Sequence, residues 1–193
     1  MVVAIDGPAG AGKSTVARAA ARALGFAFLD TGSMYRAAGV AGGPHRVGVD
    51  AEGRVTIDGE VAGDDVLRTP QASEAASRVA GDPDVRAALV ALQQRTMASG
   101  DWVAEGRDIA TVVAPDAAVK VFLTADPQER ARRRAAQTGE TVEQVLAAQA
   151  ARDERDSGHG RTTTAPAPGA VELDTTGLSV DEVVARIVEL VPR

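Results

Sequence analysis

Cysteine is absent from this chain of 193 residues, and aromatic side chains are scarce. Without thiols the protein has neither a disulfide framework nor a thiolate-ligated metal site, a composition that fits a reducing compartment. One Trp, one Tyr and three Phe are too few for a platform on which the bases of single-stranded nucleic acid stack. The formal net charge of −6 also argues against a general nucleic-acid binder.

Long apolar runs are missing as well. No stretch reaches the length of a membrane-spanning helix, and the N-terminus lacks the basic and apolar regions of a signal peptide. We therefore expect a cytoplasmic monomer whose partners include neither a membrane nor a nucleic acid. Lysine is rare too, since Lys13 and Lys120 are the only two among 21 basic residues. A lone arginine is accordingly weak evidence of function in this chain, whereas a lysine within a motif is strong evidence.

The most informative segment, residues 7–15, fits the phosphate-loop pattern G-x-x-x-x-G-K-[ST] and directly follows the apolar run 2–5. In this pattern the glycines let backbone N–H groups surround a polyphosphate. Lys13 reaches the β- and γ-phosphates, and the Ser14 hydroxyl binds Mg²⁺. The predicted triphosphate site is made of Gly7, Pro8, Ala9, Gly10, Ala11, Gly12, Lys13, Ser14 and Thr15.

Apolar runs alternate with helical segments along the rest of the chain. Strands are predicted at 2–5, 26–29, 102–105, 119–123 and 171–174, and helices at 16–24, 33–41, 141–152 and 179–190 among others. Thr31 is the predicted cap of the second of these helices, and Ser179, with Glu182, that of the last. The alternation predicts an α/β fold, a three-layer P-loop NTPase core around a parallel sheet of about five strands.

The composition changes in the segment 39–97, where Gly, Asp and Val are frequent and Gly42-Gly43-Pro44 interrupts the pattern. We predict that residues 39–97 form a small lobe inserted between strands of the main sheet. The core would then consist of residues 1–38 and 98–193.

Polar clusters follow the ends of predicted strands, which is where ligands bind in parallel sheets. One cluster is 30–36, which ends in an arginine, and another is 105–108, which contains Arg107 and Asp108. Phosphoryl transfer needs phosphates that are held in line and surrounded by positive charge, and arginine grips phosphate oxygens with a planar fork. Asp108 is either a salt-bridge partner of Arg107 or an acceptor for an exocyclic amine of a base. The basic run 130–134 either belongs to this site or forms a solvated helix face.

Taken together, these segments resemble those of the bacterial cytidylate kinases, a family of nucleoside monophosphate kinases. The resemblance spans nearly the whole chain in the family's order, and only the phosphate loop is shared with many other NTPases. It is found in residues 5–15, 29–36, 106–117, 120–125, 152–157 and 173–176. It implies a reaction in which ATP and CMP or dCMP give ADP and the diphosphate, with Mg²⁺.

The resemblance also implies roles for individual residues. The implied catalytic set is Lys13, Arg36, Arg107, Arg130 and Arg152, and Arg133 joins the phosphate loop in binding ATP. The implied CMP site contains Thr31, Tyr35, Arg36, Ser77, Arg86, Arg107, Asp108 and Asp156, among which Asp108 reads the cytosine amino group with Ser77 and Arg86. Ser14 is the implied metal ligand. Residues 39–97 become the NMP-binding lobe, and residues from about 130 to 160 a short lid that excludes water.

The chain departs from the family's pattern in two places. Its inserted lobe is shorter than the usual one. His159 stands where the family has an arginine that would grip the acceptor phosphate, and Arg161 is the candidate to replace it. If neither side chain reaches that phosphate, we expect weaker acceptor binding and an intact ATP site.

Two other interpretations stay open at this point. One is a P-loop kinase for another small acceptor, such as UMP, AMP or a metabolite alcohol; Asp108 favours cytosine over these because a carboxylate suits an amine donor. The other is a nucleotide-binding switch with little turnover. A switch would need a longer apolar run before an aspartate than the four residues that precede Asp30.

Overall fold

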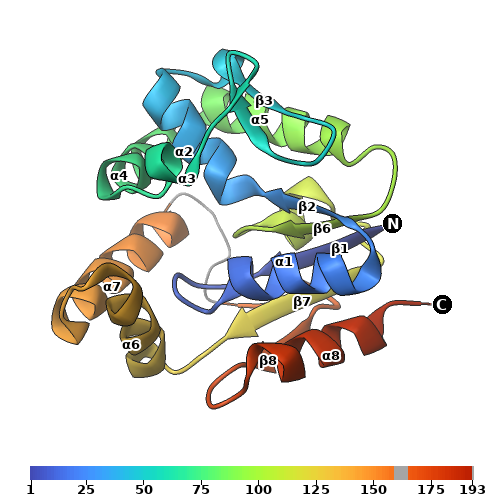
Figure 1. Cartoon of the computed structure of the whole chain (residues 1–193), viewed down its shortest axis with the longest axis vertical. Coiled ribbons are helices and arrows are strands. Elements are labelled where there is room, and N and C mark those ends of the chain that lie inside the picture. Colours follow the sequence, from blue (N-terminus) through green and yellow to red (C-terminus); the bar gives the residue numbers. More distant parts are fainter. Residues whose placement is uncertain (159–164, 193) are drawn as a thin grey trace.

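The computed structural model describes the backbone of residues 1–158 and 165–192, and the side chains there except those of Gln137, Arg152, Asp153 and residues 155–158. Its centre is a five-stranded sheet in which every pairing is parallel, in the order β2-β6-β1-β7-β8 (Figure 1). The strands are β1 (Val2–Asp6), β2 (Ala27–Asp30), β6 (Trp102–Glu105), β7 (Val119–Thr124) and β8 (Val171–Asp174). The predicted α/β class and parallel sheet are thereby confirmed.

The sheet is buried on both faces because its inner strands are apolar on both sides. In β1, Val3 and Ile5 pack with the helices α1 (Lys13–Leu24) and α8 (Val180–Leu190), whereas Ala4 belongs to the core on the opposite face. Strands that are covered on both faces are expected to read as continuous apolar runs, as these do. The helices and the sheet form the three predicted layers.

The second group of elements lies between β2 and β6 in sequence and above the sheet in Figure 1. It contains a small antiparallel sheet in the order β3-β4-β5. Its elements are α2 (Thr31–Ala41), η1 (Pro44–Arg46), β3 (Val47–Val49), β4 (Val55–Ile57), β5 (Glu60–Val61), α3 (Asp64–Leu67), α4 (Pro70–Val79) and α5 (Pro83–Thr96). The helices α2 and α4 approach closely at Gly39, where a Cβ would lie 2.7 Å from the Cβ of Ala75.

The second helix begins earlier than predicted, and its cap is a different residue. The side chain of Asp30 accepts a hydrogen bond from the Ser33 N–H at 2.8 Å, so Asp30 rather than Thr31 is the N-cap of α2. The Thr31 hydroxyl instead donates to the carbonyl of Glu105 at 2.7 Å. The prediction for the last helix is confirmed, because Ser179 and Glu182 form a complete capping box at the start of α8.

Three further elements complete the fold. One is a single wide turn of helix, η2 (Ile109–Val113), which the sequence pattern did not predict. The others are α6 (Pro127–Thr138) and α7 (Val142–Gly158), which pack against each other and lie beside the sheet in Figure 1. Within residues 1–158 and 165–192, no helix combines the length and the apolar character that a membrane crossing requires.

Candidate active site

The phosphate loop (residues 7–15) follows β1 and runs into the start of α1, and two of its glycines have conformations and neighbours that a side chain would strain. At Gly7, a Cβ would lie 2.1 Å from the carbonyl oxygen of Leu123. At Gly10, where φ is +78°, a Cβ would lie 2.5 Å from the side-chain nitrogen of Gln149. Gly12 is the N-cap of α1, which has no acidic residue in its first turn. The positive end of the helix dipole at this loop therefore meets no carboxylate from the helix's own first turn.

Three consecutive carbonyl groups of the phosphate loop each accept a hydrogen bond from a basic side chain. The donors come from the start of α1, from the segment after β6 and from α6. They are Lys13 to Pro8 at 2.8 Å, Arg107 to Gly7 at 3.1 Å, and Arg130 to Ala9 at 2.6 Å. The structure thus brings three of the predicted catalytic side chains to one loop from three separate segments.

Three buried carboxylates lie at the ends of neighbouring strands, and sequence reasoning assigned a role to none of them. Asp30 ends β2, Glu105 ends β6 and Asp6 ends β1. The register pairs Asp30 with Glu105, and Glu105 with Ile5, the residue before Asp6. Less than a tenth of each residue is exposed. The available signal was an acidic residue that closes an otherwise apolar strand at the sheet edge where ligands bind.

Glu105 connects this group of carboxylates to the phosphate loop. Its Oε1 accepts a short hydrogen bond from the Ser14 hydroxyl. Burial raises the pKa of Glu105 and the negative charge of Asp30 raises it further, while Lys13 and the Ser14 hydrogen bond oppose the increase. A hydroxyl beside a carboxylate offers the hard oxygen donors that Mg²⁺ prefers, so the residues present fit that ion.

The predicted acceptor-binding side of the site begins at the end of β2. Arg36 donates to the carboxylate of Asp30 at 3.2 Å and to the Ser33 hydroxyl at 2.6 Å. Tyr35 is buried on the same helix, and Thr31 is held against β6 by its bond to the Glu105 carbonyl. These contacts fix the Arg36 guanidinium beside the strand ends that also carry the buried carboxylates.

The structure joins two of the three predicted base-reading residues. The Arg86 guanidinium on α5 forms an ion pair with the Asp108 carboxylate at 2.5 Å, and the Asp108 side chain is 9% exposed. Ser77, the third residue, donates to the carbonyl of Ser73 one turn earlier in α4. A groove of about 390 Å³ borders Arg86 on the side of the α4–α5 turn. It is lined by Ala80, Gly81, Pro83, Arg86, Ala87, Val90 and Val112.

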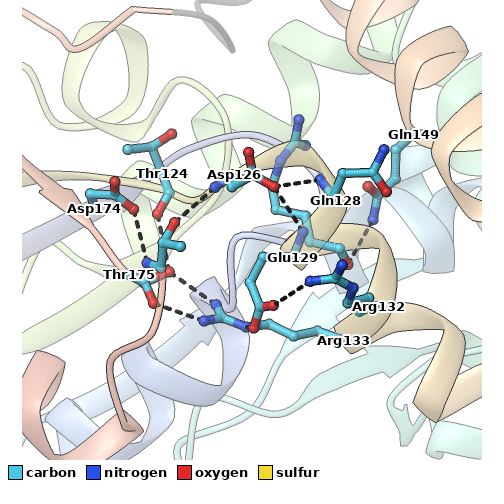
Figure 2. A network of polar contacts seen from close by, with 11 residues as sticks. Thr124, Asp126, Gln128, Glu129, Arg132, Arg133, Gln149, Asp174 and Thr175 are labelled. Atoms are coloured by element: carbon cyan, nitrogen blue, oxygen red, sulfur yellow. Dashed lines mark hydrogen bonds and ion pairs between the residues drawn. The ribbon is translucent and has the colours of Figure 1, made fainter. Parts of the chain in front are cut away.

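Arg133, predicted to bind ATP, joins α6 to the segment after β8 (Figure 2). Its guanidinium donates to the hydroxyl of Thr175 at 3.0 Å and to the carbonyl of Thr175 at 2.7 Å. Glu129 accepts from the Nε of Arg133 at 3.0 Å, and the Thr175 hydroxyl donates to the carbonyl of Thr124 in β7. A Cβ on Gly12 would lie 4.0 Å from Nη1 of Arg133. The guanidinium is therefore held next to the last glycine of the phosphate loop.

For several residues of the predicted lid, the structure describes no side chain or no atoms at all. The backbone of Arg152 and Asp156 belongs to α7, but their side chains are not described. His159 and Arg161, which bear on acceptor binding, lie outside the described residues altogether. Within the described ranges, no three His, Asp or Glu side chains gather as a metal-binding group, and this includes the three carboxylates at the strand ends.

Comparisons with known proteins agree on one family. A family model described as cytidylate kinase matches residues 3–50 and 45–193. A cytidylate kinase from Carboxydothermus hydrogenoformans is 42% identical, over 100% of this chain and 98% of its own length. A cytidylate kinase from Cereibacter sphaeroides strain KD131 is 48% identical, over 98% of this chain and 94% of its own length.

The fold is also found among solved structures of lower sequence similarity. The crystal structure of a shikimate kinase from Bacteroides thetaiotaomicron superposes with a TM-score of 0.55 at 14% identity. The alignment covers 98% of this chain and 97% of that protein. At this level of identity the likeness shows a shared fold and nothing of the acceptor.

Proposed function

The chain belongs to the cytidylate kinase family, and from that premise we propose that it transfers the γ-phosphoryl group of ATP to CMP or dCMP. The observation that best supports the proposal is the position of the 105–108 segment. It presents Arg107 to the phosphate loop at Gly7 and Asp108 to Arg86 of α5. The proposed triphosphate site and the proposed base-reading pair would then lie on opposite sides of one short turn.

On the donor side, the phosphate loop would surround the β- and γ-phosphates of ATP with backbone N–H groups and Lys13. Arg133, held by Thr175 beside Gly12, would contribute to the same site. Ser14 and Glu105 would hold Mg²⁺, Ser14 as a direct ligand. When bound, Mg²⁺ neutralises charge that develops on the phosphate oxygens.

On the acceptor side, Arg36, Arg107 and Arg130 would surround the phosphate that receives the γ-phosphoryl group. An oxygen of that phosphate attacks the γ-phosphorus in line, the bond to the β–γ bridging oxygen breaks, and ADP leaves with that electron pair. The arginines stabilise the charge on the transferring group by donating to its equatorial oxygens. Binding by several side chains in fixed positions also supplies the alignment that the reaction needs.

Recognition of the base would come from Asp108, which accepts from the amino group of cytosine, with Arg86 and Ser77 beside it. Thr31, Tyr35 and Asp156 complete the proposed CMP site. Uracil presents a carbonyl in place of that amino group, so a carboxylate at this position disfavours UMP.

The proposal extends to the organisation of the chain. Residues 39–97 would act as the NMP-binding lobe on a core of residues 1–38 and 98–193, and residues from about 130 to 160 as a lid that includes Arg152. The cysteine-free composition fits the cytoplasm as the proposed compartment. We propose a monomer that acts on free nucleotides.

A steady-state assay of ADP release tests the proposed function. ATP and Mg²⁺ are held constant, and CMP, dCMP, UMP, AMP, GMP and water are compared as acceptors. We expect CMP and dCMP to give the highest kcat/KM, with hydrolysis in their absence far slower. Equal rates with all monophosphates, or no stimulation by CMP or dCMP, would refute the proposal.

A further inference from the structure

The helical turn η2 is capped by a residue from a different strand. Oδ1 of Asp6, at the end of β1, accepts from the N–H of Ile109 at 2.9 Å, and Oδ2 accepts from the N–H of Ala110 at 2.8 Å. Asp108 occupies the N-cap position of this turn, where an aspartate normally caps its own helix. Its side chain makes no such bond. Asp6 therefore caps η2 in place of Asp108.

The consequence for Asp108 is that its carboxylate points elsewhere. Oδ2 of Asp108 accepts from the Arg86 guanidinium at 2.5 Å instead of from its own backbone. The neighbouring residue is fixed by the same part of β1, because Nη1 of Arg107 donates to the carbonyl of Gly7 at 3.1 Å. Two adjacent residues at the end of β1 therefore hold the segment that presents Arg107 and Asp108.

Position 6, which caps η2, requires a carboxylate. Ile109, Ala110 and Asp6 are all buried, so water does not replace a lost hydrogen bond at these N–H groups. Both oxygens of a carboxylate accept, which satisfies two donors at once. An asparagine of the same shape accepts with one atom and turns an NH₂ group toward the second N–H. If Asp6 fails to accept, the nearest alternative cap is the Asp108 carboxylate.

We propose that Asp6 is a positioning residue for base recognition: it caps η2 in place of Asp108 and so leaves the Asp108 carboxylate available to the amino group of cytosine. This inference rests on the proposed function, since it needs a base-reading Asp108. In the proposed site, Asp6 touches neither nucleotide. It affects recognition of the base only by setting the direction of the Asp108 side chain.

The test measures base selectivity rather than activity alone. The ratio of kcat/KM for CMP to kcat/KM for UMP is determined for wild type, Asp6→Asn, Asp108→Asn and the double variant. We expect Asp6→Asn to lower the ratio by roughly 10- to 100-fold, the effect of one hydrogen bond to a charged group, with KM for ATP unchanged. In the double variant, Asp108→Asn is expected to lower the ratio no further, because both changes remove the same contact.

A purely structural role for Asp6 gives a different result. It would lower the melting temperature and the rates with CMP and UMP together, leave their ratio unchanged, and overturn the inference. Ser179→Ala is the matched control, since it removes a helix cap in α8, and it is expected to leave the ratio at its wild-type value. If Asp6→Asn does not fold, Asp6→Ser replaces it; its single oxygen should give a smaller loss of selectivity, and an unchanged ratio again overturns the inference.

The outcomes separate this inference from the proposed function. A wild-type enzyme that does not prefer CMP over UMP refutes base reading by Asp108, and with it the proposed acceptor. A wild-type enzyme that prefers CMP, together with an Asp6→Asn variant that keeps the full preference, refutes only the role of Asp6.

Discussion

At the scale of single residues, Glu105 at the end of β6 is a buried acid, a choice that selection for stability alone would not favour. Glu105 is buried, and its pKa is raised by that burial and by Asp30, while Lys13, the Ser14 hydroxyl and Arg36 favour its charged form. A group whose pKa is raised by folding binds its proton more tightly in the folded state. Its contribution to the free energy of unfolding therefore decreases as the pH rises from its ordinary value of 4.5 toward the raised value.

Replacing Glu105 by glutamine should stabilise the protein and impair catalysis. The amide carries no charge, so Glu105→Gln is expected to raise the melting temperature at pH 7 by about 2–4 °C, equivalent to roughly 1 kcal/mol. The gain should shrink as the pH falls toward 4.5, because folded wild-type Glu105 then keeps its proton and carries no buried charge. Melting curves of both proteins between pH 5 and pH 8 measure this difference. A gain that is constant with pH would contradict the assigned cause.

Lys13 is the second residue whose role a single substitution can test. Lys13→Met keeps the length of the side chain and removes its charge, and we expect kcat for ADP formation to fall about 10²- to 10³-fold. The chain's other lysine, Lys120 in β7, provides the control, because Lys120→Met removes the same charge away from the phosphate loop. Comparable losses in the two variants would show that overall charge, rather than the position of Lys13, controls the rate.

The residues of the candidate site differ in how far the sequence revealed them. The spacing of Gly7, Gly12 and Lys13 is local and specific, so the sequence alone predicted a loop between β1 and α1 at these residues. The bond from Ser14 to Glu105 joins residues 91 positions apart, and that of Asp6 to η2 more than 100. No local pattern encodes such contacts, because they arise only when β1 and β6 lie side by side. Glu105 was therefore predicted only as a member of the polar cluster 105–108, and neither its bond to Ser14 nor the bonds of Asp6 to η2 could be predicted.

At the scale of elements, a network of polar contacts joins α6 to the segment after β8 (Figure 2). Asp126 caps α6 by accepting from the backbone of Gln128 and Glu129, and its own N–H donates to the hydroxyl of Thr176. Arg133, two turns into α6, holds Thr175 with two parallel bonds. One end of this stretch of helix is thus attached to Thr176 and the other to the adjacent Thr175.

Replacing Arg133 by lysine should loosen that attachment without removing the charge. A lysine ammonium lacks the planar fork that reaches the hydroxyl and the carbonyl of Thr175 together, so we expect KM for ATP to rise roughly tenfold. KM for CMP should change little. Arg132→Lys is the matched control, since Arg132 lies on the same helix with a side chain that is 67% exposed. An equal rise in KM for ATP in the control would rule out the attachment to Thr175 as the cause.

Elements with a strong apolar period or a clear cap were predicted well, and irregular ones were not. The capping box of α8 was predicted because all its members lie within four residues. The start of α2 was missed because Asp30 and Thr31 are both good caps, and the choice depends on the bond from Thr31 to β6. The turn η2 has no apolar period and no local cap in the sequence. Its first two N–H donors are satisfied by Asp6, which lies in another strand, so no local signal predicted it.

At the scale of the whole molecule, two ligands that occupy neighbouring sites should each stabilise the fold. A ligand at 100 times its dissociation constant adds about 2.7 kcal/mol, or about 5–10 °C in melting temperature for a chain of this size. We expect a non-hydrolysable ATP analogue with Mg²⁺ to give one such shift and CMP to add a second. Thermal melts with each ligand alone and with both measure this. UMP in place of CMP should add much less; an equal shift would contradict selective binding.

The parallel sheet has a consequence for the time course of synthesis. Of the five strands of this sheet, β1 is synthesised first and becomes the central strand. Its neighbours are β6, which begins at Trp102, and β7, which begins at Val119. At 5–20 residues per second, β1 waits roughly 5–20 s for about 100 further residues before either neighbour exists. During that interval the apolar segment 2–5 has no partner in its own sheet, so the nascent chain exposes a template for aggregation that chaperones would have to cover.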